Sequence, residues 1–412
     1  MTNGSATPAT RPVRTPRRRR PPPRTLLLMA ARRVHFLAGI AVAPFVFLLA
    51  ATGLGHTVAP LLDDLIHPTA LFVDEVGAQA LPVSEQVSAA LIEHRGARVT
   101  SVTVPGDPDR TTRVALDVLG VPLSVYVDPY TAVVRGTLES TGTPTREWLA
   151  EAHRSLHLGE PGRLYAEFAV SWLPIIVLFG VFLRVSQRRR SGARAWHGAL
   201  GLALAAALLL IGFSGVQRTV LAGERVSAVL STAPPRLHAP PVTPAPARVG
   251  VDDVVALARS AGLSGALTVV PPERGDRPYE VAESGGGPSQ VDKVAVDPYL
   301  GRVTAAVGWA DYSATAKARA VATAFHHGLL FGWANRLVLA GVALGTIALL
   351  ALGYRMWWAR REAPPPVWRY LSTRARTLLI VGTAGVCWLL PVLGASLVAF
   401  AAVDRLARRR SR

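Results

Sequence analysis

The chain has 412 residues, half of them hydrophobic, and a formal net charge of +18 at pH 7. Its arginines cluster beside long apolar runs instead of covering a soluble face, which indicates membrane topology and argues against nucleic-acid binding. The single cysteine, Cys387, excludes an intrachain disulfide, a cysteine-based zinc site and a Cys-ligated iron–sulfur cluster.

Four apolar runs are long enough to cross a bilayer, which takes about 20 residues. We predict transmembrane helices over residues 34–55, 164–185, 196–217 and 333–356. The segment before them, 1–30, is rich in arginine and proline without periodicity, which predicts a disordered basic tail.

The basic segments set the expected topology. By the positive-inside rule the N-terminus lies in the cytoplasm, together with the loops 186–195 and 357–376. The first apolar run lacks a clear cleavage site, so we expect it to be retained as a span instead of being removed as a signal peptide.

The last apolar run, 377–403, gives conflicting signals. One more span would leave the basic tail, 404–412, outside, against the positive-inside rule. A re-entrant hairpin split at Pro391 would have halves too short to cross the membrane. We expect one tilted C-terminal helix, with a re-entrant segment as the alternative.

Residues 57–160 and 219–325 are polar enough to lie outside the membrane. Each contains a stretch with helical spacing, LPVSEQVSAALIEHRGA or VDDVVALARSAG, followed by alternating apolar and polar residues typical of strands. We predict two extracytoplasmic α+β modules, each with one helix and a small antiparallel meander. Both contain DPY after a strand, and because Asp-Pro is a common turn former we interpret this triplet as structural.

The chain also contains an internal repeat. HRSLHLGEPGRL at 153–164 and HHGLLFGWANRL at 326–337 place a histidine, a glycine and Arg-Leu in the same register. The interval between corresponding copies is shortest for His35 and His197, longer for the DPY triplets and longest for these two frames. Such a slow rise favours a duplicated unit of span, external module and span, with a few inserted residues. The predicted fold is a mainly α membrane protein with a four-helix core and a pseudo-two-fold axis along the membrane normal.

Four histidines occupy matched positions at the ends of the spans. His35 and His197 lie at the cytoplasmic ends of the first and third spans, and His153 and His326 at the outer ends of the second and fourth. Two imidazoles on facing helices are the usual ligands of a b-type haem in a helical bundle. We therefore predict two b-type haems, one near each membrane surface, with these histidines on the iron. The alternative is that they bond only to water, lipid headgroups or a carbonyl.

Two further histidines are candidates for the same sites. His157 follows His153 by four residues and would share its helical face, so which of the two binds the iron stays open. His327 points about 100° away from His326 on a helix, so we expect it to support the site without binding the metal.

Other residues near the repeat have different expected roles. Arg163 and Arg336 could pair with haem propionates. His56 has Arg218 at its matching position, and we interpret it as an interface residue. No catalytic residue is identified. The sequence has no GxGxxG, P-loop or HExxH motif, so electrons would come from quinol or a cytoplasmic reductase.

The order RRVHFLAGI, ATGL, HRSLHLGEPGRL, WHGALG, GFSG, DPY and FHHGLLFGWANRL resembles the PepSY-associated transmembrane family of bacterial inner-membrane proteins, also described as iron-regulated or iron-uptake proteins. The resemblance covers about residues 30–360, and the His-x5-Gly frame is its most specific part. It implies four core helices in contact with membrane lipid and two extracytoplasmic PepSY-like modules.

Some members of this family are di-haem ferric-siderophore reductases, which pass electrons outward to release Fe(II) from a chelate. The resemblance implies the same four haem ligands and a ferric siderophore or other ferric chelate as electron acceptor. A second hypothesis is a non-enzymatic membrane protein whose PepSY modules bind or regulate an extracytoplasmic peptidase, or sense the cell envelope.

Overall fold

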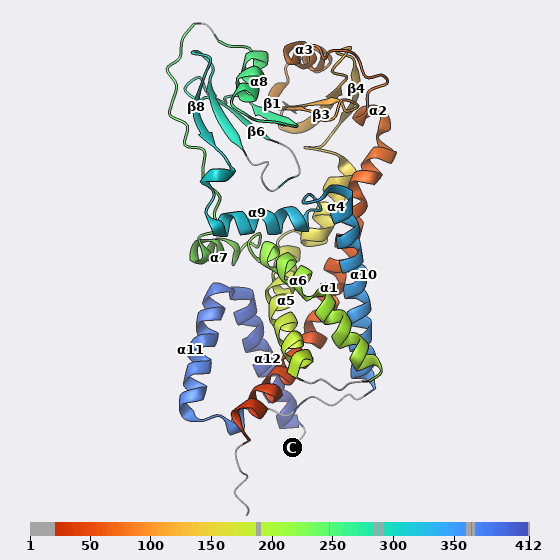
Figure 1. The fold of residues 1–412 in the computed structure, drawn as a ribbon, viewed down its shortest axis with the longest axis vertical. Helices are drawn as coiled ribbons and strands as arrows, with labels where there is room; N and C mark the ends of the chain where they lie inside the picture. Colours follow the sequence, from red (N-terminus) through yellow and green to blue (C-terminus); the bar gives the residue numbers. More distant parts are fainter. Residues whose placement is uncertain are drawn as a thin grey trace, which may run out of the picture.

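The protein combines a bundle of long helices with one β-sheet that lies beyond one end of the bundle (Figure 1). The computed structural model describes residues 21–186, 191–246, 248–283, 287, 292–359, 364 and 367–410. We call the end of the bundle next to the sheet the sheet end, and the opposite end, where the first helix begins, the basic end.

Four helices are long and apolar enough to cross a membrane, which confirms the predicted number of core spans. They are α1 (Pro23–Ile66), α5 (Glu160–Ser186), α6 (Ala193–Val216) and α10 (Gly332–Trp358). Helix α1 packs against α5 and α10, and α6 packs against the same two helices, so the four form one bundle. One of its apolar contacts is made by Val177, Ala205, Leu208 and Val342.

Helix α1 is longer than the predicted span at both ends. The prediction of a disordered tail over residues 1–30 is wrong from Pro23 onward, because proline is tolerated in the first helical turn and the following residues are good helix formers. Residues 1–20 of that tail lie outside the described part of the chain. At the other end α1 continues to Ile66 despite Pro60, so the start of the predicted external module is helical.

Eight antiparallel strands form a single sheet in the order β4-β3-β2-β1-β5-β6-β7-β8. Their bounds are β1 Arg98–Val104, β2 Thr112–Val118, β3 Val121–Val127, β4 Val134–Leu138, β5 Leu267–Val270, β6 Tyr279–Glu283, β7 Lys293–Asp297 and β8 Arg302–Val307. The two predicted meanders are therefore joined edge to edge by β1 and β5. At this junction Thr103 lies opposite Thr268, with their hydroxyl oxygens 3.2 Å apart.

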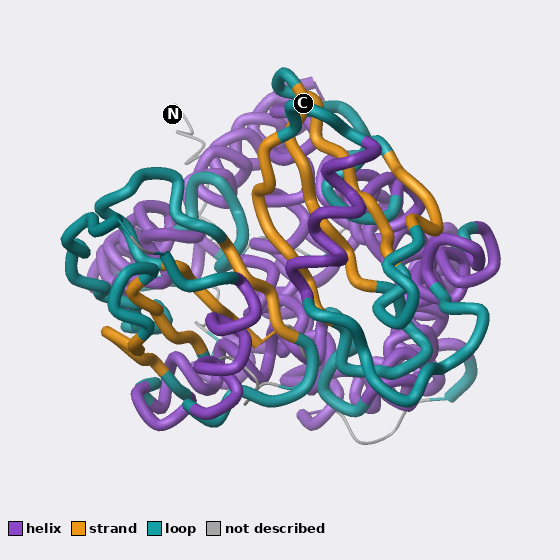
Figure 2. Tube along the Cα trace, turned by 90° about the horizontal axis from the view of Figure 1, so that it is seen from above, coloured by secondary structure: helices purple, strands orange, loops and turns teal. Residues whose placement is uncertain are grey.

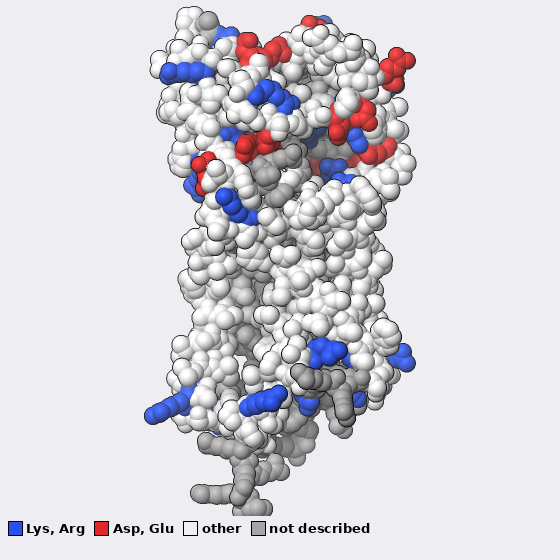
Figure 3. All heavy atoms as spheres, viewed as in Figure 1, with Lys and Arg blue, Asp and Glu red and all other residues white. Residues whose placement is uncertain are grey.

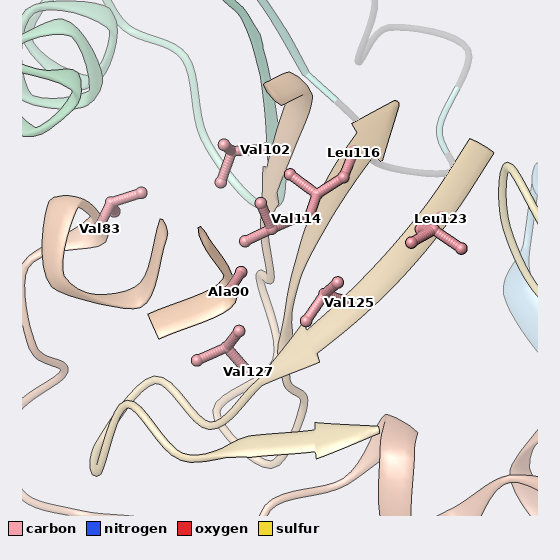
Figure 4. Close-up of a cluster of buried hydrophobic side chains, with 8 residues drawn as sticks. All are labelled: Val83, Ala90, Val102, Val114, Leu116, Leu123, Val125 and Val127. Atoms are coloured by element: carbon pink, nitrogen blue, oxygen red, sulfur yellow. The ribbon is translucent and has the colours of Figure 1, made fainter. Parts of the chain in front are cut away.

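Helices α3 (Val83–Glu93) and α8 (Val251–Ser260) cover the face of the sheet that points away from the bundle (Figure 1), and from above they lie over the strands (Figure 2). Strand alternation puts one set of valine and leucine side chains on that face. Figure 4 shows Val83 and Ala90 of α3 against Val102, Val114, Leu116, Leu123, Val125 and Val127 of the sheet. A second cluster beneath α8 includes Val254, Leu267, Val281 and Val294.

The DPY triplets form equivalent turns at the ends of β3 and β7. An oxygen of Asp128 accepts a hydrogen bond from the backbone N–H of Tyr130 at 2.8 Å, and Asp297 accepts one from Tyr299 at the same distance. Both aspartates are buried. These contacts give each triplet a structural role in turn formation.

Three short helices lie between the sheet and the bundle (Figure 1): α4 (Pro144–Ser155), α7 (Gly223–Leu230) and α9 (Ala314–His326). A fourth, α2 (Pro68–Leu71), follows α1 and packs beside β4. Helix α4 is tied to the end of α1 by an ion pair of 3.1 Å between Arg146 and the buried Asp63. The 3-10 turns η1 (Trp309–Asp311) and η2 (Trp368–Tyr370) precede α9 and the C-terminal helices.

The C-terminal apolar run forms a helical hairpin, so the expectation of one tilted span over residues 377–403 is wrong. Helix α11 (Thr373–Leu389) ends just before Pro391, which begins α12 (Pro391–Arg410), and the two helices lie side by side in Figure 1. The helix breaks at Leu390, whose backbone is not helical (φ −122°, ψ 81°), as is favoured for a residue directly before proline. The predicted basic tail, 404–412, is helical in backbone as far as Arg410.

The hairpin contacts the bundle through α12. Leu393 is fully buried against Val42 and Trp172 of the bundle, and the Trp172 indole N–H donates to the Ser396 hydroxyl at 2.9 Å. Both ends of the hairpin lie at the basic end, which removes the conflict with the positive-inside rule. Residues 187–190, 360–363, 365–366 and 411–412 of the predicted basic segments lie outside the described part of the chain.

Charge divides the visible face of the molecule into three zones (Figure 3). Acidic side chains on this face lie only over the sheet end, where basic ones also lie. A band across the bundle shows no charged side chain, and at the basic end the charged side chains are basic. This is the distribution of a membrane-spanning protein with one strongly cationic side.

Candidate functional site

The first histidine pair lies at the basic end of the bundle. His35 of α1 and His197 of α6 have ring centroids 6.1 Å apart, with the ring planes at 75°. The Nδ1 atom of His35 lies 2.9 Å from the carbonyl oxygen of Ile176, and that of His197 lies 3.1 Å from the carbonyl oxygen of Leu349. Because a carbonyl oxygen can only accept, Nδ1 carries the proton in both rings and Nε2 keeps the lone pair that a metal requires.

The second histidine pair lies at the sheet end, on two short helices. His153 of α4 and His326 of α9 have ring centroids 6.0 Å apart, with the ring planes at 86°. Nδ1 of His153 lies 3.0 Å from the Thr52 hydroxyl oxygen, and Nδ1 of His326 lies 2.7 Å from the Ser214 hydroxyl oxygen.

Those two hydroxyl groups act as acceptors toward the histidines. Thr52 donates its own proton to the carbonyl of Leu48 at 2.7 Å, and Ser214 donates to that of Ile211 at 3.1 Å. Each oxygen is then left to accept from the histidine Nδ1–H. All four predicted histidines are therefore held in the same tautomer, by backbone carbonyls at the basic end and by hydroxyls at the sheet end.

Burial keeps the sheet-end pair uncharged. It lowers the pKa of His153 to about 4, with His56 and His327 adding to the effect, and lowers the pKa of His326 to about 3, with help from His153 and His327. Both rings are therefore neutral at pH 7, which is the protonation state of a metal-bound imidazole.

The residues that orient the histidines follow the spacing of the sequence repeat. The interval from Thr52 to Ser214 equals that from His35 to His197, and the interval from Ile176 to Leu349 equals that from His153 to His326. Sequence reasoning missed all four contacts. A signal existed for the hydroxyls, because both stand directly before the matched glycines of ATG and FSG. None existed for the carbonyls, which every residue type possesses.

Glycines give the histidine rings space on neighbouring helices. A Cβ atom added at Gly180 would lie 2.9 Å from Cε1 of His35, and one at Gly53 would lie 3.2 Å from Cε1 of His153. Gly353 stands at the position matching Gly180, and its Cβ would lie 3.6 Å from Cε1 of His197. A side chain at Gly180 or Gly53 would therefore displace a ring.

His157 does not share the face of His153, contrary to the expectation from its i+4 spacing. Helix α4 ends at Ser155, and Leu156 and His157 both adopt left-handed backbone conformations with φ of 52° and 58°. The chain therefore leaves the helix before His157, whose ring packs on Trp148 at a centroid distance of 4.9 Å.

The other candidates lie at varying distances from the sheet-end pair. His327 lies beside His326, with ring centroids 6.0 Å apart, and His56, expected to be only an interface residue, lies 6.5 Å from His153. Arg163 is exposed in the first turn of α5, and Arg336 packs against Gly328. Neither arginine forms an ion pair with a described carboxylate.

Within the described ranges, no group of three or more His, Cys, Asp or Glu side chains is placed to hold a metal ion. Each histidine pair instead offers two nitrogen atoms, the number of protein ligands that an iron already bound by a macrocycle accepts.

Comparison with known proteins identifies the family. No curated protein matches the chain. A family profile described as "PepSY-associated TM region" matches residues 32–360, which include most of α1, the other three candidate spans, both histidine pairs and the whole sheet. The chain is therefore a multi-pass membrane protein that belongs to the PepSY-associated TM region family.

Proposed function

We propose that the protein is a di-haem b-type electron-transfer protein that reduces ferric chelates, such as ferric siderophores, in bacterial iron uptake. One observation carries the proposal: at each end of the bundle two histidine rings lie close together, with centroids 6.1 and 6.0 Å apart, and each ring has its Nδ1 bonded so that Nε2 is the metal-binding nitrogen. The repeat-matched glycines and hydroxyls support the same interpretation, because they fit a duplicated unit that holds one ligand of each pair in each half.

The spacing of the rings fits bis-imidazole ligation. A metal held at about 2 Å from the nitrogen of each ring would place the two ring centroids about 6 Å apart. The centroid distances of 6.1 and 6.0 Å meet this requirement at both ends. A haem bound at each pair would supply a one-electron carrier.

The two pairs define a path along the bundle. Helix α6 carries His197 near its start and, near its end, Ser214, which holds His326. At about 1.5 Å of rise per residue these two positions lie roughly 25 Å apart along the helix axis, close to the hydrocarbon thickness of a membrane. Helices α1, α5, α6 and α10 run between the two pairs, and each of them supplies the carbonyl or hydroxyl oxygen next to one histidine Nδ1.

The direction of transfer follows from the proposed topology. The cationic basic end favours a cytoplasmic location for the N-terminus and for His35 and His197, with the protein in the bacterial inner membrane. Electrons would enter there from quinol or a cytoplasmic reductase and leave at His153 and His326, beneath the PepSY-like modules. The ferric chelate would be reduced at the sheet end without entering the membrane.

Haem content tests this function directly. The full chain, expressed with adequate haem and purified in detergent, is expected to contain two dithionite-reducible b-type haems. His197→Ala and His326→Ala are each expected to retain one, at opposite ends. His157→Ala and the exposed linker variant His238→Ala are expected to retain both.

The contrary outcomes are equally specific. A purified wild-type chain without a Soret band would reject the electron-transfer function and leave the peptidase-binding alternative. Loss of both haems in His197→Ala, with a folded protein by size-exclusion chromatography, would reject the pairing of the histidines.

A further inference from the structure

Four nitrogen-bearing side chains stand close in sequence to the sheet-end histidines or to the hydroxyls that orient them, at positions matched by the sequence repeat. His56 and Arg218 each stand one helical turn after the hydroxyl that orients a histidine, and they correspond to each other in the two copies of the repeat. Arg154 and His327 directly follow His153 and His326 and correspond in the same way. We call these four residues, His56, Arg154, Arg218 and His327, the sheet-end rim.

Ring contacts place two members of this rim, His56 and His327, against the histidine pair. The rings of His56 and His327 lie 6.5 and 6.0 Å from those of His153 and His326, respectively. Arg218 lies in the turn directly after α6, where its backbone N–H donates to the carbonyl of Gly215 at 3.0 Å. The same helix end presents Ser214 to His326.

The positive charge of the rim is poorly compensated. Arg154 pairs with Glu151 at 2.7 Å, but no described carboxylate lies within ion-pair distance of Arg218. Nearby Arg319 donates to the Ser227 hydroxyl at 3.1 Å and also has no carboxylate partner among the described residues. Partial burial, together with Arg154 and Arg319, lowers the pKa of Arg218, as expected where cations gather without an anion.

A guanidinium group recognises a carboxylate through two parallel N–H bonds, and neighbouring imidazole N–H groups add further donors. We propose that Arg218, with His56, Arg154 and His327, binds a carboxylate ligand on the outer side of the His153–His326 pair. The carboxylate belongs either to a propionate of a haem held by that pair or to a polycarboxylate ferric chelate arriving from outside. In either case the inference rests on the proposed function of the pair. In this proposal the sheet-end rim, and not Arg163 or Arg336, binds the anion at this end of the bundle.

The test compares wild type with Arg218→Gln, Arg218→Lys and the exposed linker variant Arg236→Gln as control. Haem-free full-length protein in detergent is titrated with haem b and with its dimethyl ester, whose propionates carry no charge. If the carboxylate is a propionate, wild type binds the free acid about tenfold or more tightly than the ester at the sheet-end pair. Arg218→Gln loses that preference, Arg218→Lys keeps part of it and Arg236→Gln keeps all of it.

A second titration detects a substrate carboxylate. Ferric citrate binding is measured by equilibrium dialysis on haem-loaded and haem-free protein. If the carboxylate belongs to the chelate, Arg218→Gln weakens ferric citrate binding about tenfold or more while its haem titration matches wild type.

Unchanged binding of both probes in Arg218→Gln, with a wild-type elution profile on size exclusion, would overturn the inference. If wild type binds no haem, the proposed function is rejected. The citrate titration on haem-free protein then tests the sheet-end rim by itself: weaker binding in Arg218→Gln supports the rim, and equal binding overturns it.

Discussion

The two histidine pairs have nearly equal ring separations but different supports. At the basic end both histidines stand on membrane-spanning helices and bond to backbone carbonyls of α5 and α10. At the sheet end both stand on short helices outside the candidate spans and bond to side-chain hydroxyls of α1 and α6. The orientation of the basic-end rings therefore depends on helix packing, whereas that of the sheet-end rings depends on two replaceable side chains.

The largest difference is expected when helix packing at the basic end is changed. Gly180→Val would place a side chain where even a Cβ lies 2.9 Å from the ring of His35. We expect this variant to lose the basic-end haem, about half of the pigment, and to retain the sheet-end haem. Gly341→Val on span α10 is the matched control, since Gly341 is exposed and nothing lies within 4 Å of its Cβ position. Pyridine haemochrome assays on both purified variants measure the loss, and full pigment in Gly180→Val would contradict the packing argument.

A smaller effect is expected when a hydroxyl at the sheet end is removed. Thr52→Val deletes the acceptor of the His153 Nδ1–H, and loss of such a contact typically weakens metal binding by about 10- to 100-fold. The affinity of the basic-end pair should not change. Thr57→Val serves as control, because that hydroxyl bonds to the carbonyl of Leu54 on the same helix. Haem titration of haem-free protein distinguishes the two sites, and equal affinities in wild type and Thr52→Val would show that the hydroxyl does not orient the ring.

The smallest effect concerns the C-terminal hairpin, which packs on α5 and has no counterpart against α10 among the described residues. Trp172→Phe removes the hydrogen bond to Ser396, at a cost of about 1 kcal/mol. The unfolding midpoint in detergent should fall by about 2 °C, with both haems retained. Trp333→Phe, at a tryptophan that is 74% exposed, should leave the midpoint unchanged. A fall of equal size in both variants would indicate that the Ser396 contact contributes nothing.

Much of the fold is accessible from the sequence because the membrane imposes long apolar helices and the repeat matches their ends. The four spans follow from apolar length, and the order of His35, His153, His197 and His326 predicts which rings face each other. The family assignment is confirmed by the match over residues 32–360. The haems and the reductase activity stay predictions.

The remaining features depend on tertiary contacts that leave no local pattern. Nothing in strands β1 and β5 indicates that they pair, because either could equally have been an exposed edge. His157 satisfies the i+4 rule, but the helix ends before it. Pro391 indicates a possible break, yet the packing of α12 on α5 that stabilises the hairpin depends on partners such as Trp172, which is far from Ser396 along the chain.

The continuous sheet has a mechanical consequence for the sheet-end pair. Helix α4 follows β4 at one edge of the sheet, and α9 follows β8 at the other. His153 and His326 are therefore joined through the full width of eight hydrogen-bonded strands as well as through the bundle. This connection limits how far the two rings can separate. If the proposed function is correct, it would also limit the structural reorganisation that accompanies each electron transfer.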